Sequence, residues 1–282
     1  MRRFTSGSGS EGGRKMKKYF SFFRMRLIAG LQYRTAALAG LSTQLVWGCM
    51  EILLYRAFWQ ECHERFPMGQ EALSSYIWLQ QALLSVFALW YWEQDLIASV
   101  RDGTVAYELT RPVNLYSMWM ARTLAMRLSR AALRCWPILL VSVLIPSPYG
   151  LRIRIGLPVF LLFLISLGLM LAVVCGFVLA AYALSFHLVD TNGFRVLSVA
   201  AADLLGGGVV PLPFLPEPLR TIASVSPFGS MQNVPLRIFG GDLAGSEAVR
   251  AVELQAFWAV TLIGLGIFLT RSGIRKAEIA GG

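Results

Sequence analysis

The chain has 282 residues, of which 56% are hydrophobic and 15% are charged, and its formal net charge is +10 at pH 7. Because a soluble domain of this length seldom carries so little charge, the composition excludes an ordinary soluble protein and indicates an integral membrane protein. The excess of Lys and Arg flanks apolar runs, as membrane topology requires, and we therefore expect no nucleic-acid partner.

Runs of about 20 apolar residues predict an all-α membrane fold with six spanning helices. Basic residues precede the first run and follow the last, so both termini are expected on the cytoplasmic side. One membrane domain is expected at 16–282, behind a flexible, Gly- and Ser-containing arm at 1–15. The predicted spans are 36–59, 76–96, 124–145, 157–186, 196–215 and 254–270.

The segment 16–31, ahead of the first span, predicts a basic amphipathic helix. Its apolar residues recur at helical spacing, and basic residues lie opposite them. Such a helix lies on the inner membrane surface; the alternative is that it extends the first span into the cytosol. The residues assigned to it are Lys17, Lys18, Phe20, Phe23, Arg24 and Leu27.

Several motifs that carry chemistry are missing from the sequence. It contains no GxxxxGK[ST] loop, so any ATP that drives this protein must be bound by another chain. The two histidines, His63 and His187, are predicted on opposite membrane faces, and Cys62 has no metal-ligand spacing around it. We therefore expect neither a metal site nor an enzymatic activity in this chain.

Glu51 is the main acidic residue inside the first predicted span. A carboxylate at that depth indicates a charge that lines a pathway or pairs with a partner. The alternative is that Glu51 and Arg56 lie near the outer interface, where the arginine reaches water and the two pair loosely.

Two polar segments follow the second span. In 97–119, Gly103 is predicted to end one short helix before a second short element begins. The polar residues around it suit contacts with a soluble partner; the alternative is that the segment is a solvated loop that only connects two helices. After it come four arginines, of which Arg127, Arg130 and Arg134 share one helical face. They mark the cytoplasmic start of the third span, facing headgroup phosphates or a partner, with an acidic or phosphate-bearing cargo as the alternative. These arginines are Arg122, Arg127, Arg130 and Arg134.

The apolar stretch 204–241 contains three consecutive glycines and a series of prolines, which cannot continue a spanning helix. Inside a bilayer, irregular backbone is tolerated only where protein covers it or where it lines a water-filled cavity. The stretch therefore indicates part of a transport pathway as well as a membrane anchor.

Three stretches carry a resemblance to a known family. They are RDGTVAYELTRPVN at 101–114, GGGVVPLPFLPEPLRTIASVSPF at 206–228, and VPLRIFGG together with the terminal IRKAEIAGG. From Lys15 onward the chain resembles the ABC-2 type export permeases, in particular compact bacterial permeases that consist of a membrane domain alone.

The resemblance implies roles for three segments. The first is a cytoplasmic coupling helix that docks on an ATPase, with Arg101, Asp102, Gly103, Glu108, Arg111 and Pro112. The second is segment 16–31 as the interfacial connecting helix. The third is an outer re-entrant helical gate, with Gly207, Pro211, Pro213, Pro216, Glu217, Pro227 and Phe228.

The resemblance also implies a function and partners. It implies an exporter in the bacterial inner membrane, in which two permease chains, identical or related, form a path for an amphipathic drug, peptide or lipid-like substrate. A separate cytoplasmic ABC ATPase dimer would bind ATP and Mg, and this chain would bind no cofactor. The alternative is a secondary transporter or channel without an ATPase; such proteins have an internal repeat and intramembrane ion ligands, and neither is clear here.

Overall fold

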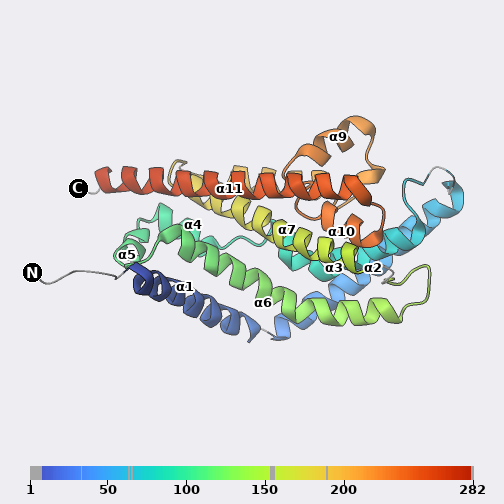
Figure 1. The fold of residues 1–282 in the computed structure, drawn as a ribbon, viewed down its shortest axis with the longest axis horizontal. Helices are drawn as coiled ribbons and strands as arrows, with labels where there is room; N and C mark the ends of the chain where they lie inside the picture. The colour runs from blue at the N-terminus through green and yellow to red at the C-terminus, as the bar shows by residue number, and fades with distance from the viewer. Residues whose placement is uncertain are drawn as a thin grey trace, which may run out of the picture.

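The computed structural model describes residues 8–32, 34–62, 64, 66–152, 156–188 and 190–280, and within them it is helical without a β-strand. Figure 1 shows the helices aligned mainly along one long axis. Their bounds are α1 (Ser8–Leu31), α2 (Arg34–Cys62), α3 (Gln70–Phe87), α4 (Gln94–Arg101), α5 (Val105–Leu109), α6 (Leu115–Leu144), α7 (Leu157–Leu184), α8 (Asn192–Leu205), η2 (Leu212–Phe214), α9 (Glu217–Val225), α10 (Asn233–Gly240) and α11 (Gly245–Ala280).

Among the described residues, three helical segments are long and apolar enough to cross a membrane: Ala37–Glu61 in α2, Leu157–Leu184 and Gly245–Lys276 in α11. A helix rises 1.5 Å per residue, so α3, with 18 residues, is about 27 Å long and α8, with 14 residues, is about 21 Å long. Both lengths are below the hydrocarbon thickness of roughly 30 Å. The 30-residue helix α6 is long enough but carries four arginines. The chain is therefore a multi-pass membrane protein.

Two predicted spans extend too far along the sequence. The helix in 196–215 ends at Leu205, because the glycines that follow turn the chain, with Gly207 at a φ of +86°. The helix in 76–96 ends at Phe87, where the local sequence contains no Gly or Pro to stop it. A tertiary contact described below accounts for that end.

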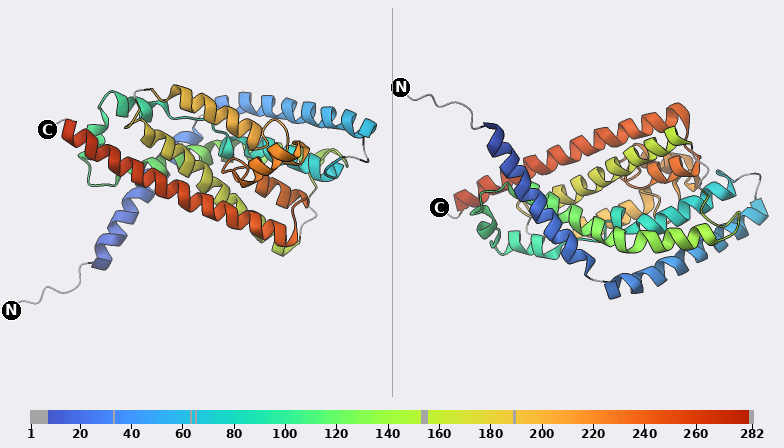
Figure 2. Two further views of the ribbon diagram at one scale, coloured as in Figure 1. Left: turned by 90° about the horizontal axis from the view of Figure 1, so that it is seen from above. Right: turned by 60° about the horizontal axis from the view of Figure 1, so that its bottom comes forward.

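The N-terminal helix is longer than predicted. α1 begins at Ser8, so it includes half of the arm that was expected to be flexible, while residues 1–7 lie outside the described residues. His63 also lies outside them. α1 packs along α6, and Figure 2 shows it crossing that helix obliquely.

The core consists of two main apolar clusters. One surrounds α7, where Val178 and Leu179 pack with Trp119 of α6. The other surrounds α3, where Tyr76 and Trp78 are buried with residues of α10. In Figure 1 the start of α1, the end of α11, α4 and α5 lie at one end of the long axis, and α9 and α10 lie toward the other end.

Candidate functional site

At the end of the molecule that holds the termini, residues 94–112 form a bent element, the α4–α5 elbow. α4 ends at Arg101, with Asp102 as its C-cap residue, and Gly103 takes a φ of +73°, a conformation that L side chains rarely adopt, before α5 begins. The Arg101 side chain donates from Nε to Asp102 Oδ1 at 3.1 Å, and both side chains are largely exposed. Arg111 and Pro112 are also exposed. The elbow therefore presents a charged outer edge.

The inner side of the elbow is fixed to the core. Leu96 and Val105 are buried in the apolar cluster around α7. The carboxylate of Glu108 accepts a hydrogen bond from Trp119 Nε1 on α6 at 2.9 Å. Glu108, predicted to be a contact for a partner, is thus engaged inside the chain, so that a displacement of the elbow would act directly on α6 and α7.

The helix α1 is attached beside the elbow. The backbone N of Asn114, the N-cap residue of α6, donates to Tyr19 Oη at 2.8 Å. On α1 itself, Phe23 and Leu27 are partly buried, whereas Phe20 is 66% exposed. The apolar face that was predicted through Phe20 is therefore only partly covered by protein. Lys17, Lys18 and Arg24 are exposed.

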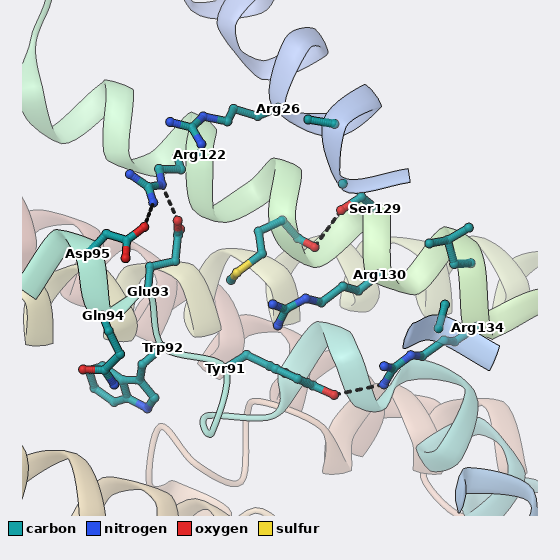
Figure 3. A pocket seen from close by; sticks show the side chains of 15 residues that line it. Arg26, Tyr91, Trp92, Glu93, Gln94, Asp95, Arg122, Ser129, Arg130 and Arg134 are labelled. Atoms are coloured by element: carbon teal, nitrogen blue, oxygen red, sulfur yellow. Dashed lines mark hydrogen bonds and ion pairs between the residues drawn. The ribbon is translucent and has the colours of Figure 1, made fainter. Parts of the chain in front are cut away.

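A cavity of about 700 Å³ lies between α1, the start of α2, α6 and the linker 88–93 that joins α3 to α4. Figure 3 shows its polar side chains converging from these elements. Arg122 forms ion pairs with Glu93 and with Asp95, the latter at 3.2 Å. Arg134 donates to Tyr91 Oη at 3.1 Å, and the guanidinium of Arg130 lies 4.5 Å from the centre of the Tyr91 ring.

Arg127 lies on the same side of α6 but points into the core. Its side chain is fully buried, and its Nη1 donates to the carbonyl oxygens of Val86 at 2.7 Å and Ala88 at 3.0 Å. Val86 belongs to the last turn of α3 and Ala88 is its C-cap residue, at the end where a helix leaves carbonyl acceptors without partners. Arg127 therefore caps α3, which explains why that helix ends before residue 96. The predicted common face is confirmed, since Arg127, Arg130 and Arg134 all contact segment 86–91.

Toward the opposite end, residues 206–240 form the Gly/Pro cap. Tyr76 Oη donates to the carbonyl of Gly207 at 3.3 Å, and Gln80 Nε2 donates to that of Gly208 at 2.7 Å. A Cβ added at Gly207 would lie 2.6 Å from Tyr76 Oη. Two consecutive turns of α3 thus hold the irregular backbone that the glycines create.

Beyond these glycines the cap forms η2, α9 and α10. Pro211, just before η2, is buried, and Pro213, inside η2, is partly buried, while Pro216 and Glu217 are exposed at the start of α9. The cap then returns to the core through Phe228, whose ring packs on Phe177 of α7 at a centroid distance of 5.4 Å. Pro227 is partly buried beside it. The structure confirms that this apolar stretch is broken into short helices covered in part by protein.

Glu51 lies between α2 and α3, where its Oε2 accepts from Gln81 Nε2 at 3.4 Å. The guanidinium of Arg56 lies 5.2 Å from the centre of the Tyr149 ring. The pathway role of Glu51 and its loose pairing with Arg56 both stay predictions.

The family comparison applies to nearly all of these elements. A family model described as "ABC-2 family transporter protein" matches residues 45–281. The chain belongs to this family. The match to the ABC-2 transporters includes the elbow, α6 and the cap, and it begins inside α2, after α1. Membership implies an ABC ATPase and a second permease as partners. Searches of curated proteins and of solved structures gave no match.

Sequence reasoning missed the residues that complete these sites. Glu93 and Asp95 follow an apolar run directly and are opposite in sign to the arginines of α6, so charge complementarity could have paired them. Tyr76 and Gln80 are four residues apart on α3, which places them on one face, yet nothing in the sequence indicates that this face meets Gly207.

Proposed function

We propose that this chain is the permease subunit of an ATP-driven exporter for amphipathic drugs, peptides or lipid-like molecules. Two permease chains form the path, and two cytoplasmic ATPase subunits bind ATP and Mg and carry out hydrolysis. The permease itself performs no chemistry on its substrate. The family affiliation supports the transporter role. The elbow and the cap lie toward opposite ends of the long axis, which supports separate roles for them in ATPase contact and in gating.

The observation that carries the proposal is the α4–α5 elbow. It combines an exposed charged edge at Arg101 and Asp102 with a buried attachment through Leu96 and Val105. It also lies at the same end of the molecule as both termini and away from the Gly/Pro cap. In the proposed topology the elbow and the termini are cytoplasmic in a bacterial inner membrane. The six crossings are α2, α6, α7, α11, α3 together with the linker 88–93, and α8 together with the first residues of the cap.

In this mechanism, nucleotide binding closes the ATPase dimer and displaces the elbow of each permease chain. The displacement reaches α6 through the Trp119–Glu108 hydrogen bond and α7 through the apolar contacts below the elbow. Because packed helices shift as units, movement of α7 reaches the cap through the Phe177–Phe228 contact. The cap then opens the outer end of the path.

Purification of the tagged chain from its native membranes, followed by assays in proteoliposomes, tests the proposal. We expect an ABC ATPase in stoichiometric amounts, with ATP hydrolysis that depends on the permease. Asp102→Lys, which reverses an exposed charge, is expected to lower the coupling of hydrolysis to transport while the complex remains assembled. Arg220→Glu is the matched control, because Arg220 is similarly exposed but lies on α9 in the cap.

Two outcomes contradict the proposal. Transport by the purified chain without any ATPase would identify a secondary transporter or channel. Unchanged coupling in Asp102→Lys, with a loss of coupling in Arg220→Glu, would remove the elbow from the ATPase contact and assign that role to the opposite end.

A further inference from the structure

The cavity between α1 and α6 has a charge imbalance that its own side chains do not neutralise. Four arginines and two carboxylates line it, which leaves a formal excess of +2. Both carboxylates pair with the same arginine, Arg122. Among the described residues, the other three arginines, Arg26, Arg130 and Arg134, contact aromatic groups instead. Within the part of the chain that the structure describes, three guanidinium groups of the cavity therefore have no carboxylate partner.

The guanidinium groups nearest to the linker are held in place by neutral contacts. One side chain, Tyr91, provides a hydroxyl acceptor for Arg134 and a ring face for Arg130. Nη1 of Arg130 is buried and has no hydrogen-bond partner in the structure. On α2, Gly40 leaves the space that the Arg134 guanidinium occupies, because an added Cβ would lie 2.5 Å from its Cζ. Preoriented donors without an anion are typical of a binding site for an anionic group.

The position of the cavity indicates where its ligand comes from. Ala37, close to the start of α2, lines it, so the cavity lies near the level where the apolar part of that helix begins. Its walls also include apolar side chains, among them Met126 and Leu133. Exposed apolar side chains continue on the adjacent helices, with Ile28 on α1 and Leu38 on α2. A cavity with charged lining residues and apolar side chains beside it suits an amphiphilic ligand at the membrane surface.

We propose that this cavity binds the phosphate-bearing headgroup of an anionic phospholipid, with Arg130 and Arg134 as the main phosphate ligands and Arg26 as a third. A guanidinium donates two parallel hydrogen bonds to phosphate oxygens, which a single ammonium group cannot do. The net charge favours a headgroup without its own cation, so phosphatidylglycerol binds more tightly than phosphatidylcholine. The inference concerns the isolated chain and does not depend on the proposed export function.

Native mass spectrometry of the detergent-purified full chain, titrated with each of the two lipids, tests the proposal. The double variant Arg130→Gln/Arg134→Gln is expected to weaken phosphatidylglycerol binding by about tenfold or more. Arg275→Gln is the matched control, because it removes an exposed charge from the same end of the molecule but outside the cavity. Its binding is expected to change by less than about twofold. Equal binding by the double variant and the wild type overturns the proposal.

A second variant keeps the test valid if the double variant misfolds. Arg26 is exposed on α1, so Arg26→Gln leaves the packing of α6 intact and is expected to weaken phosphatidylglycerol binding by about threefold. Circular dichroism and gel filtration of each variant check the fold. Loss of discrimination between phosphatidylglycerol and phosphatidylcholine in a folded Arg26→Gln protein supports the site, and unchanged discrimination in both folded variants contradicts it.

Competition distinguishes a lipid from a soluble phosphate compound. Glycerol 1-phosphate and inorganic phosphate carry the same anionic group without acyl chains. We expect neither to displace phosphatidylglycerol at millimolar concentration. Displacement that depends on Arg130 and Arg134 would assign the cavity to a soluble phosphate compound and overturn the lipid assignment.

Discussion

The α4–α5 elbow and the Gly/Pro cap both interrupt the helical bundle, and different contacts hold them in place. Around the elbow, besides the apolar contacts of Leu96 and Val105, polar side chains bind one another, with Arg122 joined to Glu93 and Trp119 joined to Glu108. In the cap, side chains of α3 bind backbone carbonyls, as Tyr76 does at Gly207. Ion pairs between side chains can rearrange while the backbone stays intact, whereas carbonyl contacts fix the backbone itself. This difference agrees with the proposed mechanism, in which the elbow end transmits movement and the cap keeps its shape until its neighbours move.

The largest effect is expected from removing a carboxylate at the elbow end. Glu93→Gln leaves Arg122, whose side chain is only 13% exposed, without its closer partner. The free energy of unfolding is expected to fall by about 3 kcal/mol, because a largely buried charge loses its compensation. Thermal unfolding in detergent measures this. Asp95→Asn is the control, with an expected loss below about 1 kcal/mol because Asp95 is 86% exposed. Equal losses of unfolding free energy in the two variants would show that the Arg122–Glu93 pair contributes no more than the exposed Arg122–Asp95 pair.

The next effect concerns the cap. Gly207→Ala adds a Cβ that approaches Tyr76 Oη and forces an L side chain into positive φ, so a loss of about 2 kcal/mol is expected. Gly241→Ala is the matched control, since Gly241 has a φ of +79° but no atom within 4 Å of an added Cβ. Its loss should be about 1 kcal/mol, from strain alone. If both variants unfold alike, the Tyr76 contact does not hold the cap.

A smaller effect is expected at the link between the elbow and α6. Trp119→Phe keeps most of the buried ring but removes the hydrogen bond to Glu108, for an expected loss of about 1 kcal/mol. In the complex with the ATPase, the same variant should lower the coupling of hydrolysis to transport. A variant with this loss of stability and unchanged coupling would show that the hydrogen bond is only structural.

The smallest effect on stability is expected from Pro213→Ala in η2, below about 1 kcal/mol, because Pro213 is partly exposed and its ring mainly restricts the unfolded chain. Transport rates in proteoliposomes should nevertheless change while the ATPase remains bound, since the proposed role of the cap is to gate the outer end. Loss of ATPase binding with normal transport would reverse the roles assigned to the two regions.

Particular residues show how far the sequence predicts the sites. Gly103 and the glycines at 206–208 could be assigned as breaks because a missing side chain or a positive φ acts locally. The common face of Arg127, Arg130 and Arg134 follows from helical spacing alone. Their different environments do not, because burial of Arg127 against α3 and exposure of Arg130 to the cavity depend on which helix packs on which side of α6.

The sequence by itself determined the membrane class, the ABC-2 affiliation and the breaks at Gly103 and at 206–208, since these follow from composition, motifs and local backbone preferences. Only the tertiary structure decided that α3 ends at Phe87, that Glu108 is bound inside the chain, and that Tyr91 holds two arginines at the wall of a cavity. The physical reason is that each of these depends on atoms far apart in the sequence. A carbonyl at Val86 and a guanidinium at Arg127 are 41 residues apart, and no local pattern contains both.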